Sequence, residues 1–95
     1  SSSNYGGTYL VKQGKMRHLH IAITNLASAN TQVIIGSVPS DSIPTMFAVS
    51  CGWSLQTSPS VAYGIVRADI NYRGEIEVYA PYTDINIIDM TYYVD

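Results

Sequence analysis

A pair of histidines separated by one residue is the sharpest chemical pattern in the sequence. His18 and His20 flank Leu19 in a stretch that alternates between polar and apolar residues. A strand of this kind places both imidazoles on one face, about 7 Å apart. Imidazole is a common metal ligand, but two histidines alone do not complete a closed site. We therefore expect no metal and no cofactor, and we interpret the pair as part of a solvent-facing or subunit-facing strand surface. The functional alternative is a transition-metal site, because three copies with this strand near a common axis would offer six imidazoles.

Aromatic residues that carry a polar atom are the second feature. The chain has eight tyrosines and one tryptophan but a single phenylalanine. Such side chains offer a flat apolar face to the C–H groups of a sugar and a polar atom to its hydroxyls, and they lose little entropy on contact. An alternative is that Trp53 caps one end of the fold while the tyrosines line contacts between subunits. The candidates for saccharide binding, all expected in or near loops, are Trp53, Tyr63, Tyr82 and Asp84.

Side chains that could hydrolyse a substrate are present in an unfavourable arrangement. Glu75 and Glu77 alternate on one strand face, which favours a solubilising surface over the two carboxylates that flank the cleft of a glycoside hydrolase. Cys51 is the only cysteine and ends an apolar stretch, so we expect a buried, inert thiol. No serine lies in a Gly-x-Ser-x-Gly motif. The sequence therefore predicts a protein that is not an enzyme, and a small polysaccharide hydrolase is the alternative to be excluded.

The charge balance narrows the choice of partners. The net charge is −2, and Lys and Arg together number only five, which is too few for the basic stripe that phosphate binding requires. The longest apolar run is far shorter than the roughly 20 residues that span a bilayer. Charged residues make up 13% of the chain, about half the usual share. We expect no nucleic-acid binding and no membrane insertion, and a surface that is partly covered by copies of the chain.

Short β-favouring runs separated by turn residues fill most of the chain. Alternation predicts that Leu19, Ile21 and Ile23 share one face, while the apolar run TQVIIG predicts a strand that is covered on both faces. The pattern is typical of an all-β fold, an antiparallel β-sandwich of seven or eight strands that resembles a jelly roll. The expected strands are 9–12, 15–24, 31–36, 45–51, 61–71, 75–79 and 85–94.

The length allows a single domain. Residues 1–7 are expected to be a linker remnant of a longer protein, and residues 8–95 one β-sandwich domain. A chain of this size buries only about two-thirds of its unfolded surface, and one cysteine excludes an intrachain disulfide. Small domains without disulfide bonds or metals often rely on association. The sequence therefore predicts a homo-oligomer.

Several segments together resemble a known group of viral domains. They are YLVKQGKM (9–16), IGSVP (35–39), Ile43-Pro44, the Gly-centred hairpin INYRGEIEVY (70–79) and TYYV (91–94). In layout they are similar to the distal β-sandwich domains, or receptor-binding heads, of tail and baseplate proteins from phages that infect Gram-positive bacteria.

This resemblance implies a homotrimer in the virion, at the tail tip or baseplate, that contacts other tail proteins. It also implies that the domain binds a host cell-surface saccharide during adsorption, although no saccharide-contacting residue can be matched one to one. The alternative is a purely structural trimerisation domain of a tail or fibre protein. His18 and His20 join Trp53, Tyr63, Tyr82 and Asp84 as the residues expected to contact the saccharide.

Overall fold

The computed structural model describes residues 7–95, and 58% of them lie in strands. The all-β prediction is therefore confirmed. The described residues contain one short 3-10 turn, η1 (Ser40–Ser42), and no α-helix, so none of them belongs to a helix that could cross a membrane. The expected linker over residues 1–7 lies outside the described part except for Gly7. The strands are β1 (Tyr9–Gln13), β2 (Met16–Thr24), β3 (Gln32–Ser37), β4 (Ala48–Gln56), β5 (Ala62–Ile70), β6 (Glu75–Tyr79) and β7 (Ile85–Tyr93).

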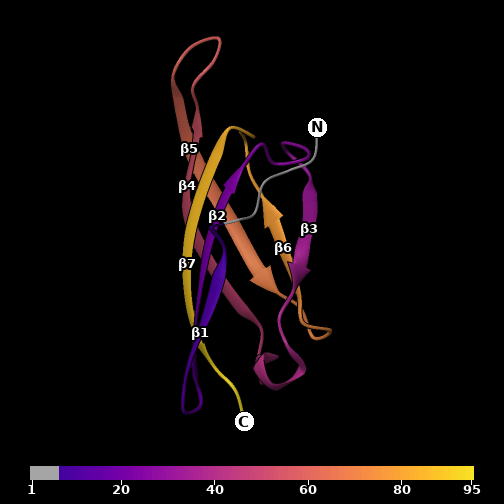
Figure 1. Ribbon diagram of the computed structural model, residues 1–95. Coiled ribbons are helices and arrows are strands. Elements are labelled where there is room, and N and C mark those ends of the chain that lie inside the picture. Colours follow the sequence, from indigo (N-terminus) through magenta and orange to yellow (C-terminus); the bar gives the residue numbers. More distant parts are fainter. Residues whose placement is uncertain (1–6) are drawn as a thin grey trace.

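All seven strands belong to one antiparallel sheet with the order β1-β2-β7-β4-β5-β6-β3. The sheet curls, so that β3 and β6 lie across from β1, β2 and β7 (Figure 1). Strand β4 pairs with β5 along its whole length but with β7 only from Gly52 to Leu55. At this crossing the backbones approach closely, because a Cβ atom at Gly52 would collide with the carbonyl oxygen of Ile87. Glycine is therefore required inside the strand.

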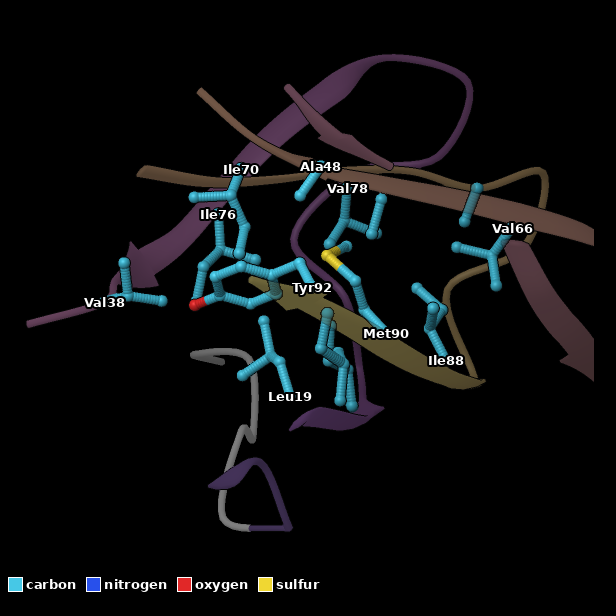
Figure 2. Packing of buried hydrophobic residues seen from close by; sticks show 14 of the residues in the cluster. Leu19, Val38, Ala48, Val66, Ile70, Ile76, Val78, Ile88, Met90 and Tyr92 are labelled. Atoms are coloured by element: carbon cyan, nitrogen blue, oxygen red, sulfur yellow. The ribbon is translucent and has the colours of Figure 1, made fainter. Parts of the chain in front are cut away.

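The inner face of the curled sheet encloses one hydrophobic core. Leu19, Ile21 and Ile23 of β2 are buried there, as the alternation predicts. They meet apolar side chains from β5, β6 and β7. Figure 2 shows the ring of Tyr92 between Leu19 and Ile76, with its hydroxyl at the edge of the core. Sheet curvature and period-two alternation together give this small domain a single interior.

A buried arginine fixes the loop that contains η1 to the lower end of the sheet. The Arg17 side chain is only 6% exposed, and its Nε donates a hydrogen bond of 2.8 Å to Ser42 Oγ. A second guanidinium nitrogen donates to the carbonyl oxygen of Asp41 at 3.0 Å, and the Tyr92 hydroxyl donates to that of Ser42 at 2.7 Å. A buried charge is tolerated only when its donors are satisfied. This loop supplies two acceptors, and the carbonyl oxygens of Gly14 and Met16 accept from the remaining guanidinium nitrogen.

Three local expectations are wrong. The strand expected over 45–51 runs from 48 to 56, so Trp53 lies within β4 and not in a loop. Cys51 is exposed instead of buried, because β4 turns it away from the core. The TQVIIG run is not covered on both faces: β3 is an edge strand that pairs only with β6, and Ile34 is largely exposed.

Candidate functional site

The side of the sheet that points away from the core is called the outer face, and its most apolar part surrounds Trp53. In the register of the sheet, Trp53 lies opposite Ile65 of β5 and Ile87 of β7. Trp53 is 47% exposed, whereas Tyr63 and Ile65 are each 73% exposed. We define the hairpin face as the two cross-strand rows Ile65–Trp53–Ile87 and Tyr63–Leu55–Ile85.

The hairpin face is flat because paired strands hold every member of it. Trp53 and Tyr63 are diagonal cross-strand neighbours on β4 and β5, and such neighbours have backbones about 7–8 Å apart. None of the six side chains is charged. A single exposed apolar residue is common on protein surfaces, but a contiguous group is a mark of binding. This surface therefore suits an apolar or amphipathic ligand such as the face of a sugar ring.

A polar cluster lies on the outer face of β1, β2 and β7, where both histidines contact one carboxylate. Asp89 Oδ1 lies 3.0 Å from His18 Nε2 and 2.8 Å from His20 Nδ1. The other nitrogen of His18, Nδ1, lies 3.1 Å from Thr91 Oγ1. These contacts, led by the one to His20, hold the pKa of Asp89 below its ordinary value. We call these four residues the imidazole cluster, and the ring of Tyr9 lies over His20 with centroids 5.0 Å apart.

The imidazole cluster adjoins the hairpin face. Asp89 follows Ile87 by two residues on the same face of β7, and Ile87 lies opposite Trp53. The Ser50 hydroxyl donates a hydrogen bond of 2.7 Å to the carbonyl oxygen of Asp89, which links β4 to β7 at this point. The outer face thus carries aromatic rings beside carboxylate, imidazole and hydroxyl groups. This combination can contact both the apolar face and the hydroxyl groups of a saccharide.

Tyr82 and Asp84 lie elsewhere, in the connection between β6 and β7. Asp84 Oδ2 accepts hydrogen bonds from the backbone N–H of Thr57 at 2.7 Å and from its hydroxyl at 2.9 Å. The bond from the Thr57 backbone contributes most to holding the pKa of Asp84 below its ordinary value. The Tyr82 ring packs beside Gly64, on the inner side of β5. The structure therefore groups Trp53 with Tyr63 and His18 with His20, and separates Tyr82 and Asp84 from both pairs.

A carboxylate pair on β5 and β6 was not anticipated. Asp69 lies directly opposite Glu77, and the pKa of Asp69 is raised to about 6, first by burial and then by a hydrogen bond to Glu77 and the charge of that residue. The guanidinium of Arg67 lies 5.3 Å from the centroid of the Tyr79 ring beside the pair. Glu75, considered with Glu77 on sequence grounds, instead accepts a hydrogen bond from the side chain of Asn71. The sequence did contain a signal for this pair: strand pairing counted outward from the turn that contains Gly74 places Asp69 opposite Glu77.

Neither metal binding nor similarity to known proteins assigns a role to these groups. Among residues 7–95, no three His, Cys, Asp or Glu side chains are placed to hold a metal ion together. No protein-family model and no curated protein matches the chain. The outer face, with the hairpin face and the imidazole cluster side by side, is therefore the candidate functional site on geometry alone.

Proposed function

We propose that this chain is a non-catalytic recognition domain of a phage tail or baseplate protein, which binds a host cell-surface saccharide during adsorption. Within the virion it works as a homotrimer whose subunits are antiparallel β-sandwiches related to the jelly roll. Its partners are the host saccharide and neighbouring tail proteins. The proposal combines the sequence resemblance with the surface of the outer face.

The observation that carries the proposal is the pairing of Trp53 and Tyr63 on the hairpin face. Both rings are exposed on adjacent paired strands, so their positions are fixed before any ligand arrives. Rigid aromatic side chains lose little conformational entropy on binding. On the same face, Asp89 follows two residues after Ile87, which lies opposite Trp53, and Asp89 together with His20 provides hydrogen-bonding groups for sugar hydroxyls.

Weak sites of this kind become effective when several act together. A shallow aromatic surface grips one saccharide weakly, but linked sites gain avidity through effective concentration, by as much as about 10²–10⁴ over single-site affinity. Three subunits on one axis, repeated on one virion, provide that multiplicity. The trimer is thus part of the mechanism of adsorption.

The carboxylate pair supports a binding role over hydrolysis. In glycoside hydrolases the two catalytic carboxyl groups are about 5 to 9.5 Å apart, because the substrate or a water molecule lies between them. Asp69 and Glu77 instead lie directly opposite each other on paired strands, and Glu77 raises the pKa of Asp69. We interpret them as two carboxyl groups that face each other and not a substrate, and we assign neither a catalytic role.

A glycan array with matched variants tests the proposal. The wild-type chain is expected to bind a cell-wall or capsular saccharide of a Gram-positive bacterium, and Trp53→Ala and Tyr63→Ala are expected to lose that binding. Ile34→Ala is the control, because Ile34 is about as exposed as Trp53 but lies on the edge strand β3, outside the hairpin face. Binding that survives both hairpin-face changes, or that Ile34→Ala abolishes equally, would contradict the proposal.

The alternative is a purely structural trimerisation domain, favoured by the aliphatic members of the hairpin face. Ile65 is as exposed as Tyr63, and an isoleucine contributes to protein contacts more readily than to sugar contacts. On this view the hairpin face is covered by a neighbouring subunit. A blank array together with an intact trimer that Ile65→Ser dissociates would establish the alternative.

A further inference from the structure

A further exposed aromatic ring of the outer face belongs to the edge strand β1. Tyr9 is 54% exposed, and its ring lies over His20 of β2 with centroids 5.0 Å apart. The register of the sheet pairs Tyr9 with His20, and His20 in turn with Asp89 of β7. The ring of Tyr9 is therefore held by a neighbour on a paired strand, as Trp53 is, and about half of its surface remains open to a ligand.

A groove lies between Tyr9 and the hairpin face. Its walls include Ala22 of β2 together with Ile85 and Ile87 of β7, and its volume is about 210 Å³. Both isoleucines are members of the hairpin face, so the groove is continuous with that surface. Ala22 lies opposite Ile87 and two residues from His20 on the same face of β2. The groove therefore leads from the hairpin face toward the imidazole cluster and Tyr9.

The groove exists because two neighbouring positions carry almost no side chain. Gly7 lies so close to Ala22 that a Cβ atom at Gly7 would be 2.8 Å from the Cβ atom of Ala22. Thr8 fixes this approach, since its hydroxyl oxygen accepts a hydrogen bond of 3.2 Å from the backbone N–H of Ala22. A larger residue at position 22 would fill the space between the aromatic rings. The isoleucine walls are apolar, which suits the C–H face of a sugar.

Tyr9 and Trp53 are too far apart for one sugar ring to contact both. Strands β2 and β7 separate β1 from β4 (Figure 1), and three strand spacings amount to roughly 14 Å. Polar groups lie between the two rings. Both imidazoles contact Oδ1 of Asp89, and this side chain is 56% exposed, so its other oxygen can accept a hydrogen bond from a sugar hydroxyl.

From this arrangement we infer that the outer face binds a chain of several linked sugars, with one sugar on Trp53 and another, farther along the chain, on Tyr9. The sugars between them lie along the groove over Ala22 and beside Asp89. The inference rests on the proposed saccharide binding and specifies its ligand, which is a stretch of a linear polysaccharide and not a single terminal sugar. Tyr9 is then a residue that selects for the length of the ligand.

Calorimetry with saccharides of graded length tests the inference. The probes are fragments of a Gram-positive cell-wall polysaccharide that binds on the array, fractionated into lengths of one to six sugar units. The affinity of the wild type is expected to rise with length until a fragment spans both rings, and then to level off. Tyr9→Ala should weaken binding of the longest fragments about fivefold to tenfold, as the loss of one aromatic contact implies. Binding of the single sugar should be unchanged.

Matched variants separate the ring from the rest of β1. Tyr9→Phe keeps the ring and should keep most of the affinity for long fragments. Val11→Ala is the control, because Val11 is the next residue of β1 on the outer face and is similarly exposed. Ala22→Leu fills the groove and should remove the gain with length while sparing the single sugar. Circular dichroism checks that each variant is folded.

Two results would overturn the inference and leave the proposed function intact. One is a Tyr9→Ala variant that binds the longest fragments as tightly as the wild type does. The other is a wild type that binds a single sugar as tightly as a fragment of six. A wild type that binds no fragment at all would contradict the proposed function as well.

Discussion

The hairpin face and the exposed residues at the opposite end of the molecule present similar apolar side chains but differ in how the fold holds them. Each residue of the hairpin face lies on a paired strand, and polar groups that can form hydrogen bonds adjoin it on β2 and β7. The exposed residues at the other end, called the end patch, are Met46, Phe47, Tyr72 and Tyr93, and they come from a loop, a turn and the end of a strand.

This difference indicates that exposure alone does not define a role. The total accessible area, 5419 Å², is close to the roughly 5,400 Å² expected for a compact monomer of this mass. The accessible area is therefore that of an ordinary monomer, and the amount of surface alone does not require a partner. The polar groups that adjoin the hairpin face favour a ligand there, and the end patch has no comparable group of hydrogen-bonding side chains.

The largest expected effect separates the two surfaces. Trp53→Ala combined with Tyr63→Ala should abolish retention on a saccharide-coated sensor, because the aromatic surface that contacts the sugar is lost. Phe47→Ser combined with Tyr93→Ser should leave the affinity for a free oligosaccharide, measured by calorimetry, within twofold of wild type. Equal losses in both measurements would mean that the end patch itself contacts the saccharide.

A smaller effect concerns the pH dependence of folding stability and involves two carboxyl groups of the outer face, Asp69 and Glu77. The folded-state pKa of Asp69 is raised to about 6, so its contribution to stability is present below the unfolded value near 4 and is lost as pH rises through about 6. Glu77→Gln removes a charge that raises this pKa, so the free energy of unfolding of the variant should rise relative to wild type by about 1 kcal/mol between pH 4 and pH 7. The gain is no larger because solvent screens a partly exposed pair.

Urea denaturation of both proteins at several pH values measures this difference. Glu75→Gln is the control, since Glu75 lies on the same face of β6 but accepts hydrogen bonds from Asn71 and Arg73. A constant difference between wild type and Glu77→Gln from pH 4 to pH 7 would show that Glu77 does not raise the pKa of Asp69.

The smallest effect is expected on the other side of the hairpin face, at Asp89. Its pKa is lowered, first by His20, so its contribution is present above the unfolded value and is lost as pH falls through the lowered folded value. Asp89→Asn should cost a few tenths of a kcal/mol at pH 6 and progressively less as the pH falls and the carboxylate is protonated; the cost is small because solvent screens an exposed pair. Thermal melts in which the difference stays constant as the pH is lowered would contradict this sign.

Local pattern was enough to predict much of the fold. The alternation around Leu19 and Ile21 predicted the inner face of β2, and Gly14 and Gly74, which have positive φ angles of 61° and 85°, mark the two expected turns. Gly52 was misleading, because glycine commonly marks a loop but here allows β7 to approach β4. The position of β3 at a sheet edge depends on strand order, which no local pattern encodes.

The candidate site was less predictable because its members meet only through the sheet. The partner of His18 is Asp89, 71 residues away in the chain. Trp53 and Tyr63 were both named as candidates, but their neighbouring positions follow from the register of β4 and β5. The carboxylate of Asp84, also named as a candidate, accepts a hydrogen bond from the backbone of Thr57, a partner that the sequence did not indicate. Residue type indicated which side chains could bind, and register determined which of them act together.

Chemical-shift mapping tests the central claim most directly. A saccharide that binds on the array would be titrated, as a free oligosaccharide, into the isotope-labelled chain. The account predicts that the largest shifts occur at the Trp53 indole, Tyr63, Ile65 and His20, with the end patch unchanged. Saturable binding whose shifts lie at Phe47 and Tyr93, or in the loop of Tyr82, and not on the hairpin face, would contradict it.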